Sequence, residues 1–234
     1  MKNVLIVFSN PLDGRHDDFN DWYTNVHIRD VMRMPSSVGV QRFKLAEEQP
    51  VGSAPSPYKY VVLYEIDDTE KCTAAHAGAM TPLLPISDAF DLTSPCNYFR
   101  ARSNATADPL ADATGDVIVV EFDDQKNFNA AAVAAAVGKD GLLSATHLSC
   151  LGDQLIDRAP QHPEIAVFRL SKGADAAKAM HLVESSVAQP AKVSHYRALT
   201  ERVTSANVLA ASAAEKAVED RARAALENKQ HRLP

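Results

Sequence analysis

Three side chains near the N-terminus have the types and spacing needed for proton transfer. Tyr23, His27 and Asp30 follow one another at steps of four and three residues, so on a helix they share one face. An imidazole with a pKa near neutrality can remove a proton next to a carbonyl group and return it elsewhere. This spacing is consistent with His27 as acid/base, Asp30 as its orienting partner and Tyr23 as a hydroxyl donor. The alternative is a structural histidine that only bonds to a nearby backbone group or carboxylate.

Other side chains in the first half of the sequence are candidates for binding a ligand. Arg42 can bind a carboxylate or enolate oxygen, or can form a structural ion pair. Tyr60 and Tyr64 lie on one face of an expected strand, since side chains alternate along a strand, and they either line a pocket or pack. Trp22 and Tyr23 are adjacent, so we expect one to pack and the other to face the pocket.

The sequence carries no signature of a bound metal or cofactor. His16, Asp17 and Asp18 are adjacent, and adjacent residues seldom converge on one ion. It contains neither a glycine-rich phosphate-binding motif nor a GxSxG nucleophile motif. We therefore predict no metal and no cofactor. His147 and His195 fall on expected strands and are interpreted as structural.

Composition excludes several classes of protein. The chain has 234 residues and a net charge of −6, with no basic run to bind nucleic acid. No apolar stretch reaches the roughly 18 residues of a membrane helix, and Val4–Phe8 is too short for a signal-peptide core. The 3 cysteines are far apart and fit a reducing compartment, so we expect a cytoplasmic protein.

The elements that must position these residues follow a recurring order. Strands are predicted at 4–8, 38–46, 58–66 and 97–102, and helices at 17–34 and 69–80. A second set has strands at 116–122, 142–151, 164–170 and 194–200, and helices at 127–137 and 174–187. Both sets read β-α-β-β-α-β, the ferredoxin-like unit.

The predicted fold class is therefore α+β, with two tandem ferredoxin-like units whose antiparallel sheets pack together. A four-stranded sheet with both helices on one face leaves the other face bare, and a second such sheet buries it. The predicted domains are 1–104 and 116–204, joined by a linker at 105–115. A C-terminal helix and tail occupy 205–234, with Val208, Ala211, Val218, Ala222 and Ala225 as a weak apolar stripe.

The first unit resembles the EthD-like branch of the dimeric α/β-barrel superfamily. The resemblance lies in Asn10–Arg15, Phe19–His27, Met34-Pro35 and Gln41–Phe43, and the Trp-Tyr-x-x-x-His core is its most specific part. Here Ser36 stands where the family pattern has a glycine after the proline. The resemblance implies a barrel made of two sheets, a pocket beside His76 and catalytic or binding use of His27. It does not imply one reaction, because this fold hosts many chemistries.

The two halves differ in aromatic content. Eleven aromatic residues lie at or before Phe99, including Phe90, and only four follow. We therefore expect the first unit to hold the pocket, with Tyr23, His27 and Asp30 as catalytic residues. The expected substrate-binding residues are Trp22, Arg42, Tyr60, Tyr64, His76 and Phe90.

Three functions are consistent with these features. The first is a cofactor-independent isomerase, cyclase or lyase acting on a hydrophobic aromatic or polyketide-like carbonyl compound. The second is a cofactor-free monooxygenase of the same fold, and the third is a non-catalytic small-molecule-binding or stress protein. A small hydrophobic substrate is the expected partner, without nucleic acid or membrane, and a homodimer through sheet edges or the C-terminal helix stays open.

Overall fold

The protein is described here from a computed structural model. The described residues are 3–51, 56–79, 84–93, 97–103, 115–124, 129–151, 163–187 and 192–230. The expected linker at 105–115 lies outside them except for Gly115.

The first half of the chain follows the predicted order closely. Its elements are β1 (Asn3–Ser9), α1 (His16–Trp22), η1 (Tyr23–His27), α2 (Ile28–Met32), β2 (Ser37–Leu45), β3 (Tyr60–Ile66), α3 (Thr69–Ala79) and β4 (Asn97–Ser103). The predicted helix at 17–34 is thus present, but its middle, η1, is a π-helical segment. After this helix Ser36 has a φ of 70°, in the left-handed region that favours the glycine of the family pattern.

The second half repeats that order without the π-helical segment. Its elements are β5 (Val117–Phe122), α4 (Ala130–Ala136), β6 (Leu142–Cys150), β7 (Glu164–Leu170), α5 (Ala176–Ser186) and β8 (Lys192–Ala198). Asn129 and Asp175 cap α4 and α5 by accepting hydrogen bonds from backbone N–H groups of the first turn.

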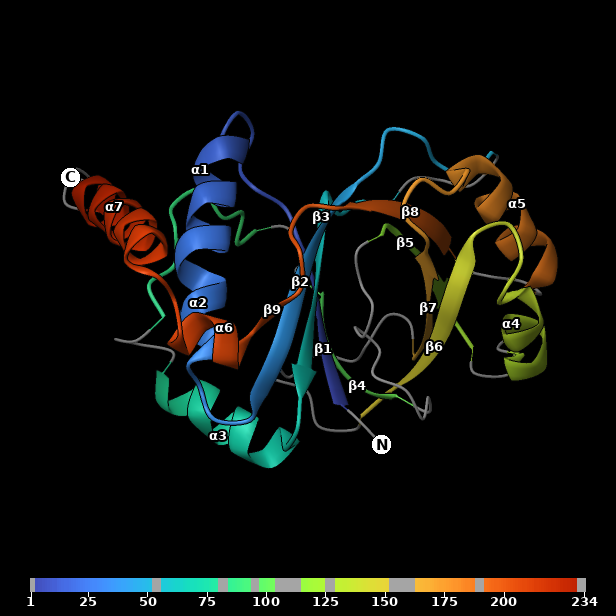
Figure 1. Cartoon of the computed structure of the whole chain (residues 1–234), viewed down its shortest axis with the longest axis horizontal. Coiled ribbons are helices and arrows are strands. Elements are labelled where there is room, and N and C mark those ends of the chain that lie inside the picture. The colour runs from blue at the N-terminus through green and yellow to red at the C-terminus, as the bar shows by residue number, and fades with distance from the viewer. Residues whose placement is uncertain are drawn as a thin grey trace.

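The strands form one curled antiparallel sheet that closes on itself. The strand order is β3-β1-β4-β6-β7-β5-β8-β2-β9, and β2 also pairs with β3, which joins the two ends of the eight longer strands. The halves meet where β4 pairs with β6 and where β2 pairs with β8. Figure 1 shows the resulting barrel in the centre, with α1 and α2 on one side and α4 and α5 on the other.

Three apolar clusters fill this architecture. One lies inside the barrel and contains residues of both halves, including Ile6, Phe43, Val119 and Val167. The other two lie between the barrel and its outer helices, one in each half. Because strand side chains alternate, β1, β2 and β3 each supply the barrel interior with one face and the outer cluster with the other.

The C-terminal segment differs from the prediction of one helix. It forms β9 (Val203–Thr204), α6 (Ser205–Leu209) and α7 (Ala213–Gln230), with a break between the helices. Thr204 and Asn207 form a capping box that starts α6. In Figure 1 α7 lies against α1 on the side away from the barrel. The predicted apolar stripe is partly wrong, because Leu226 is buried with Val208 and Ala222 while Ala225 is exposed.

Candidate functional site

Two of the three predicted catalytic residues begin and end the π-helical segment η1, and the third, Asp30, lies in α2. Tyr23 is the first residue of η1 and His27 is the last. π-helical turns are rare and are frequently found at functional sites. The wider turn brings residues five apart onto one side of the helix, so the rings of Trp22 and His27 lie 4.9 Å apart between centroids.

Trp22 and Tyr23 both point inward, so the expectation that only one does so is wrong. Their side chains are 3% and 2% exposed, and their ring centroids are 5.3 Å apart in an edge-to-face arrangement. The physical reason is that this helix is covered by the barrel and also by α7, which leaves it little solvent-facing surface. Trp22 Nε1 donates a hydrogen bond to the Pro85 carbonyl oxygen at 2.9 Å.

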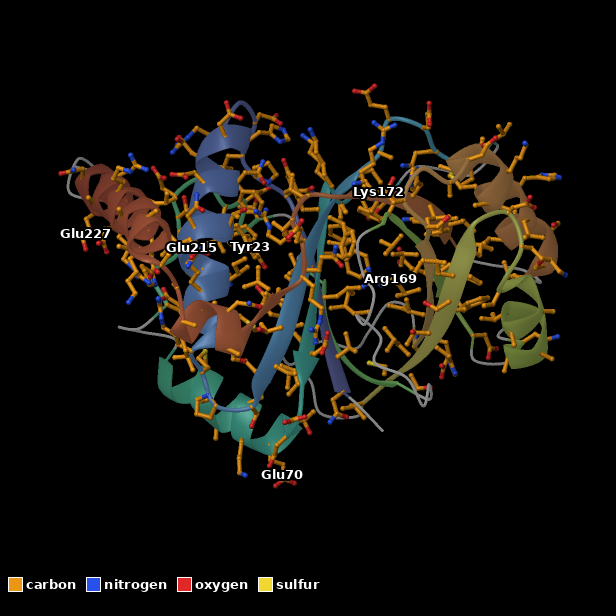
Figure 2. The ribbon with its side chains drawn as sticks, in the orientation of Figure 1. Tyr23, Glu70, Arg169, Lys172, Glu215 and Glu227 are labelled. Carbon is orange, nitrogen blue, oxygen red and sulfur yellow. The ribbon has the colours of Figure 1, made fainter. Side chains whose placement is uncertain are left out.

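Tyr23 contacts both His27 and strand β3 of the barrel. Its ring contacts that of His27 at 4.8 Å, nearly perpendicular, and Tyr64 on β3 donates a hydrogen bond to its hydroxyl at 3.3 Å. In Figure 2 Tyr23 lies in the space between the α1–α2 helix and strands β2 and β3. His27 itself is partly buried.

Arg42 on β2 is fully buried against the same rings. Its guanidinium carbon lies 4.4 Å from the Tyr23 ring centroid and 5.6 Å from those of Phe19 and Tyr60. Its nitrogens donate to neutral oxygens: the Asn20 side chain at 2.9 Å, the Asn20 carbonyl at 3.4 Å and the Thr24 hydroxyl. Burial lowers the pKa of Arg42 to about 10, while Tyr23, Tyr64 and Tyr60 act weakly in the other direction. The guanidinium therefore stays charged at neutral pH.

Tyr60 is held by two residues that the sequence analysis did not include in the site. Asn20 donates a hydrogen bond to its hydroxyl at 2.8 Å, and His16 Nδ1 lies 3.1 Å from the same oxygen. His16, Asn20 and Thr24 recur at every fourth position, which places them on one helix face opposite Arg42. This four-residue spacing is the sequence signal from which these residues could have been assigned to the site.

The remaining predicted site residues have different surroundings. Phe90 packs at the edge of the cluster, with its ring 5.8 Å from Phe19 and 6.0 Å from Trp22. His76 lies on α3, and its side chain lies outside the described residues. Asp30 accepts hydrogen bonds from Arg33 at 3.4 Å and from Arg223 of α7. This carboxylate thus connects the helix to the C-terminal segment.

Among the residues that the structure describes, every aromatic residue of the cluster around Arg42 belongs to the first half of the chain. His147 is paired with Glu164, and His195 with Asp116 at 3.2 Å, so both imidazoles have polar partners on their strands. A surface groove of about 440 Å³ runs beside α5 and is lined by residues that include Lys178 and His181. It is remote from the aromatic cluster, so we do not assign the chemistry to it.

The described part of the chain has neither a membrane-spanning helix nor a cluster of metal ligands. None of its helices is long and apolar enough to cross a membrane. No group of three or more His, Cys, Asp or Glu side chains there is placed to hold a metal ion.

Comparison with known proteins identifies the fold. No family model matches the chain, and no curated protein matches it significantly. An anthrone oxidase-like protein has a similar structure, with a TM-score of 0.53 at 12% identity over 90% of this chain and 96% of that chain. A proposed monooxygenase from Lactobacillus acidophilus has a TM-score of 0.49 at 8% identity, covering 87% and 96%. A proposed chlorite dismutase gives 0.49 at 11%, covering 89% and 98%.

The likeness to the anthrone oxidase-like protein concerns the fold, which in this chain is a curled antiparallel sheet with helices on its outer side. At such low identity the likeness establishes the fold and leaves the activity to be argued from the site.

Proposed function

We propose that the protein is a cofactor-independent enzyme that carries out acid–base chemistry on a hydrophobic, aromatic or polyketide-like carbonyl compound. The reaction is of the isomerase, cyclase or lyase type. The observation that supports this most is the π-helical segment, which brings His27 and Tyr23 into ring contact 4.8 Å apart beside the buried charge of Arg42. A proton acceptor, a hydroxyl donor and a cation therefore lie in one apolar cluster.

In this proposal each group has one role in proton transfer. His27 removes a proton from the carbon next to the substrate carbonyl, and the bond's electron pair moves onto the oxygen. Arg42 and the Tyr23 hydroxyl stabilise that enolate oxygen, and the imidazolium returns the proton to another atom. Trp22, Tyr60, Tyr64, Phe90 and His76 would enclose the substrate. Asp30 is a positioning residue, because it ties the helix to α7 through Arg223.

The chain organisation that we propose is a tandem pair of ferredoxin-like units at 1–104 and 116–204. Two occurrences of the order β-α-β-β-α-β support it, as does the single interior cluster shared by both halves. We further propose membership of the EthD-like branch, on the Trp22-Tyr23-x-x-x-His27 motif. A cytoplasmic location and a homodimer remain expectations from the sequence.

The proposed acid–base role is tested by deuterium exchange. Incubating an aromatic ketone such as 1-tetralone with the protein in D2O should label the carbon next to the carbonyl, as seen by mass spectrometry. His27→Gln should lower the exchange rate by about 10²- to 10⁴-fold, the usual contribution of a general base. His181→Gln, on the exposed side of α5, is the matched control and should exchange at the wild-type rate. Equal rates in wild type and His27→Gln would refute the assignment.

A monooxygenase is the second candidate function. Its support is the likeness to the anthrone oxidase-like protein, together with the apolar aromatic cluster. Incubation with anthrone under air and under nitrogen separates the two reactions, since only the monooxygenase consumes oxygen as product forms. A binding protein without activity, the third candidate, would retain such a ligand unchanged by mass spectrometry under both atmospheres.

A further inference from the structure

The charge of Arg42 has no counter-charge among the residues that the structure describes. The side chain is 0% exposed, and its described partners are an amide, a backbone carbonyl, a hydroxyl and three aromatic rings. Nε of Arg42 is buried and makes no hydrogen bond to any described residue. Buried charges in proteins are ordinarily paired, because an unpaired charge loses its hydration without compensation.

Two other arginines near this helix and sheet, Arg33 and Arg202, form ion pairs with carboxylates. Arg33 binds Glu219 through two hydrogen bonds of 2.7 and 2.8 Å, and Arg202 binds Glu65 in the same manner at 2.8 and 2.6 Å. Both are more exposed than Arg42, the arginine with the least access to water, and Arg42 has no carboxylate partner in the described part of the chain. Among the described residues, therefore, Arg33 and Arg202 have carboxylate partners and Arg42 does not.

The solvent-facing side of the cluster carries charges of both signs. His16 and Asn20, both partly exposed, bond to the Tyr60 hydroxyl and separate the cluster from solvent. The pKa of His16 lies below its usual value because of burial and then because Lys59 and Lys44 oppose protonation, while Asp17 and Asp13 act the other way. Lys59 and Lys44 favour the approach of an anion on this side, and Asp17 and Asp13 oppose it. A bound anion is therefore indicated by Arg42 rather than by these surface charges.

We propose that the site binds an aromatic ligand that already carries a negative charge, a carboxylate or phenolate, and that Arg42 is its counter-ion. The aromatic rings around the guanidinium contact the apolar body of the ligand. Arg42 donates charge-assisted hydrogen bonds to the ligand's anionic oxygen, and these bonds are stronger than those to the oxygen of a neutral carbonyl compound. The proposal rests on the proposed function in one respect, that the aromatic cluster is the ligand site. It adds the charge of the substrate to that function.

The test compares two probes of the same shape, 2-naphthoate and neutral 2-naphthamide, by isothermal titration calorimetry. Wild type should bind the naphthoate at least tenfold more tightly. Arg42→Met should lose that preference, and Arg42→Lys should keep part of it. Arg169→Met removes a second buried guanidinium, which stacks 5.4 Å from Phe43 on another face of the sheet, and should retain the full preference.

A stability measurement separates a ligand counter-ion from a structural residue. If Arg42 awaits an anion, Arg42→Met without ligand should unfold at a urea concentration at least as high as wild type, because an uncompensated buried charge has been removed. Naphthoate should then raise the midpoint of wild type only. Should Arg42→Met fail to fold, the proposal is overturned unless Arg42→Gln, which can keep the bonds to Asn20 and Thr24, folds and lacks the preference.

Two results would overturn the proposal outright. One is equal or absent binding of the two probes by wild type, and the other is an unchanged preference in Arg42→Met. His27→Gln distinguishes this failure from that of the proposed function. It should keep the naphthoate preference even where deuterium exchange is lost, so charge recognition and proton transfer stand or fall separately.

Discussion

At the scale of single residues, the contact between His27 and Trp22 can be measured directly. The sequence has a single tryptophan, Trp22, and its ring centroid lies 4.9 Å from that of His27. A protonated imidazole quenches indole fluorescence at contact, so the emission of wild type should be lower in acid than at neutral pH. The change should be absent in His27→Gln, as followed by a fluorescence titration.

A matched variant distinguishes this contact from a general effect of pH. His16 is on the same helix but bonds to Tyr60, so His16→Gln should retain the fluorescence titration. Loss of the titration in His16→Gln, or its persistence in His27→Gln, would contradict the described ring contact.

Residue types and spacing predicted part of this cluster. Tyr23, His27 and Arg42 carry recognisable chemistry, and the structure brings them together. Asn20 and Thr24 were missed because an amide and a hydroxyl on a helix are usually solvated. They become informative only once Arg42 is known to lie opposite them.

At the scale of elements, a compact ionic network fastens α7 to the helix that carries Tyr23 and His27. Glu219 on α7 accepts hydrogen bonds from Arg33 at 2.7 and 2.8 Å, and from Arg223 at 2.7 and 3.1 Å. Arg223 in turn binds Asp30. The hydrogen bonds from Arg33 and then Arg223 hold the pKa of Glu219 at about 2, although burial acts in the other direction.

This network predicts a pH-dependent stability. Because the pKa of Glu219 is lowered on folding, its contribution is present above its ordinary pKa of 4.5 and is lost as pH falls through about 2. Glu219→Gln should therefore destabilise the protein by roughly 1 to 3 kcal/mol at pH 7, and the difference from wild type should shrink toward pH 2. Urea unfolding across this pH range measures it.

The control for that experiment is on the same helix. Glu227 is exposed, so Glu227→Gln should follow wild type at every pH. A Glu219→Gln difference that stays constant from pH 7 to pH 2 would show that the carboxylate's charge is not what fastens α7.

Element boundaries were predictable where apolar periodicity is strong, as in β3 and β7. The π-helical segment was not, because an i to i+5 turn leaves the sequence of Tyr23–His27 compatible with an ordinary helix. The docking of α7 was also hidden. The buried residues Ala222 and Leu226 form a narrow apolar stripe on a highly charged helix. Their role became visible only from the packing of α7 against α1 and η1.

At the scale of the whole molecule, the barrel interior makes one folding unit of the two halves. The order of strands was predictable from sequence, since each half repeats one pattern and leaves a bare sheet face. The pairing of β2 with β8 and of β4 with β6 was not predictable, because the paired strands are far apart in the sequence. These pairings close the barrel around the shared cluster.

That closure predicts a single cooperative transition, which a variant in the shared cluster can test. Phe43 is 0% exposed and packs in the interior cluster with residues of both halves, so Phe43→Ala should cost about 3 to 5 kcal/mol. Hydrogen exchange followed by mass spectrometry should show protection falling equally in β3 and in β7, although Phe43 belongs to the first half only. Leu143→Ala, at a side chain 52% exposed, should change neither strand by more than about 0.5 kcal/mol. If Phe43→Ala loosens β3 while β7 keeps its protection, the halves are independent domains that merely touch, and the barrel is not the unit that positions the site.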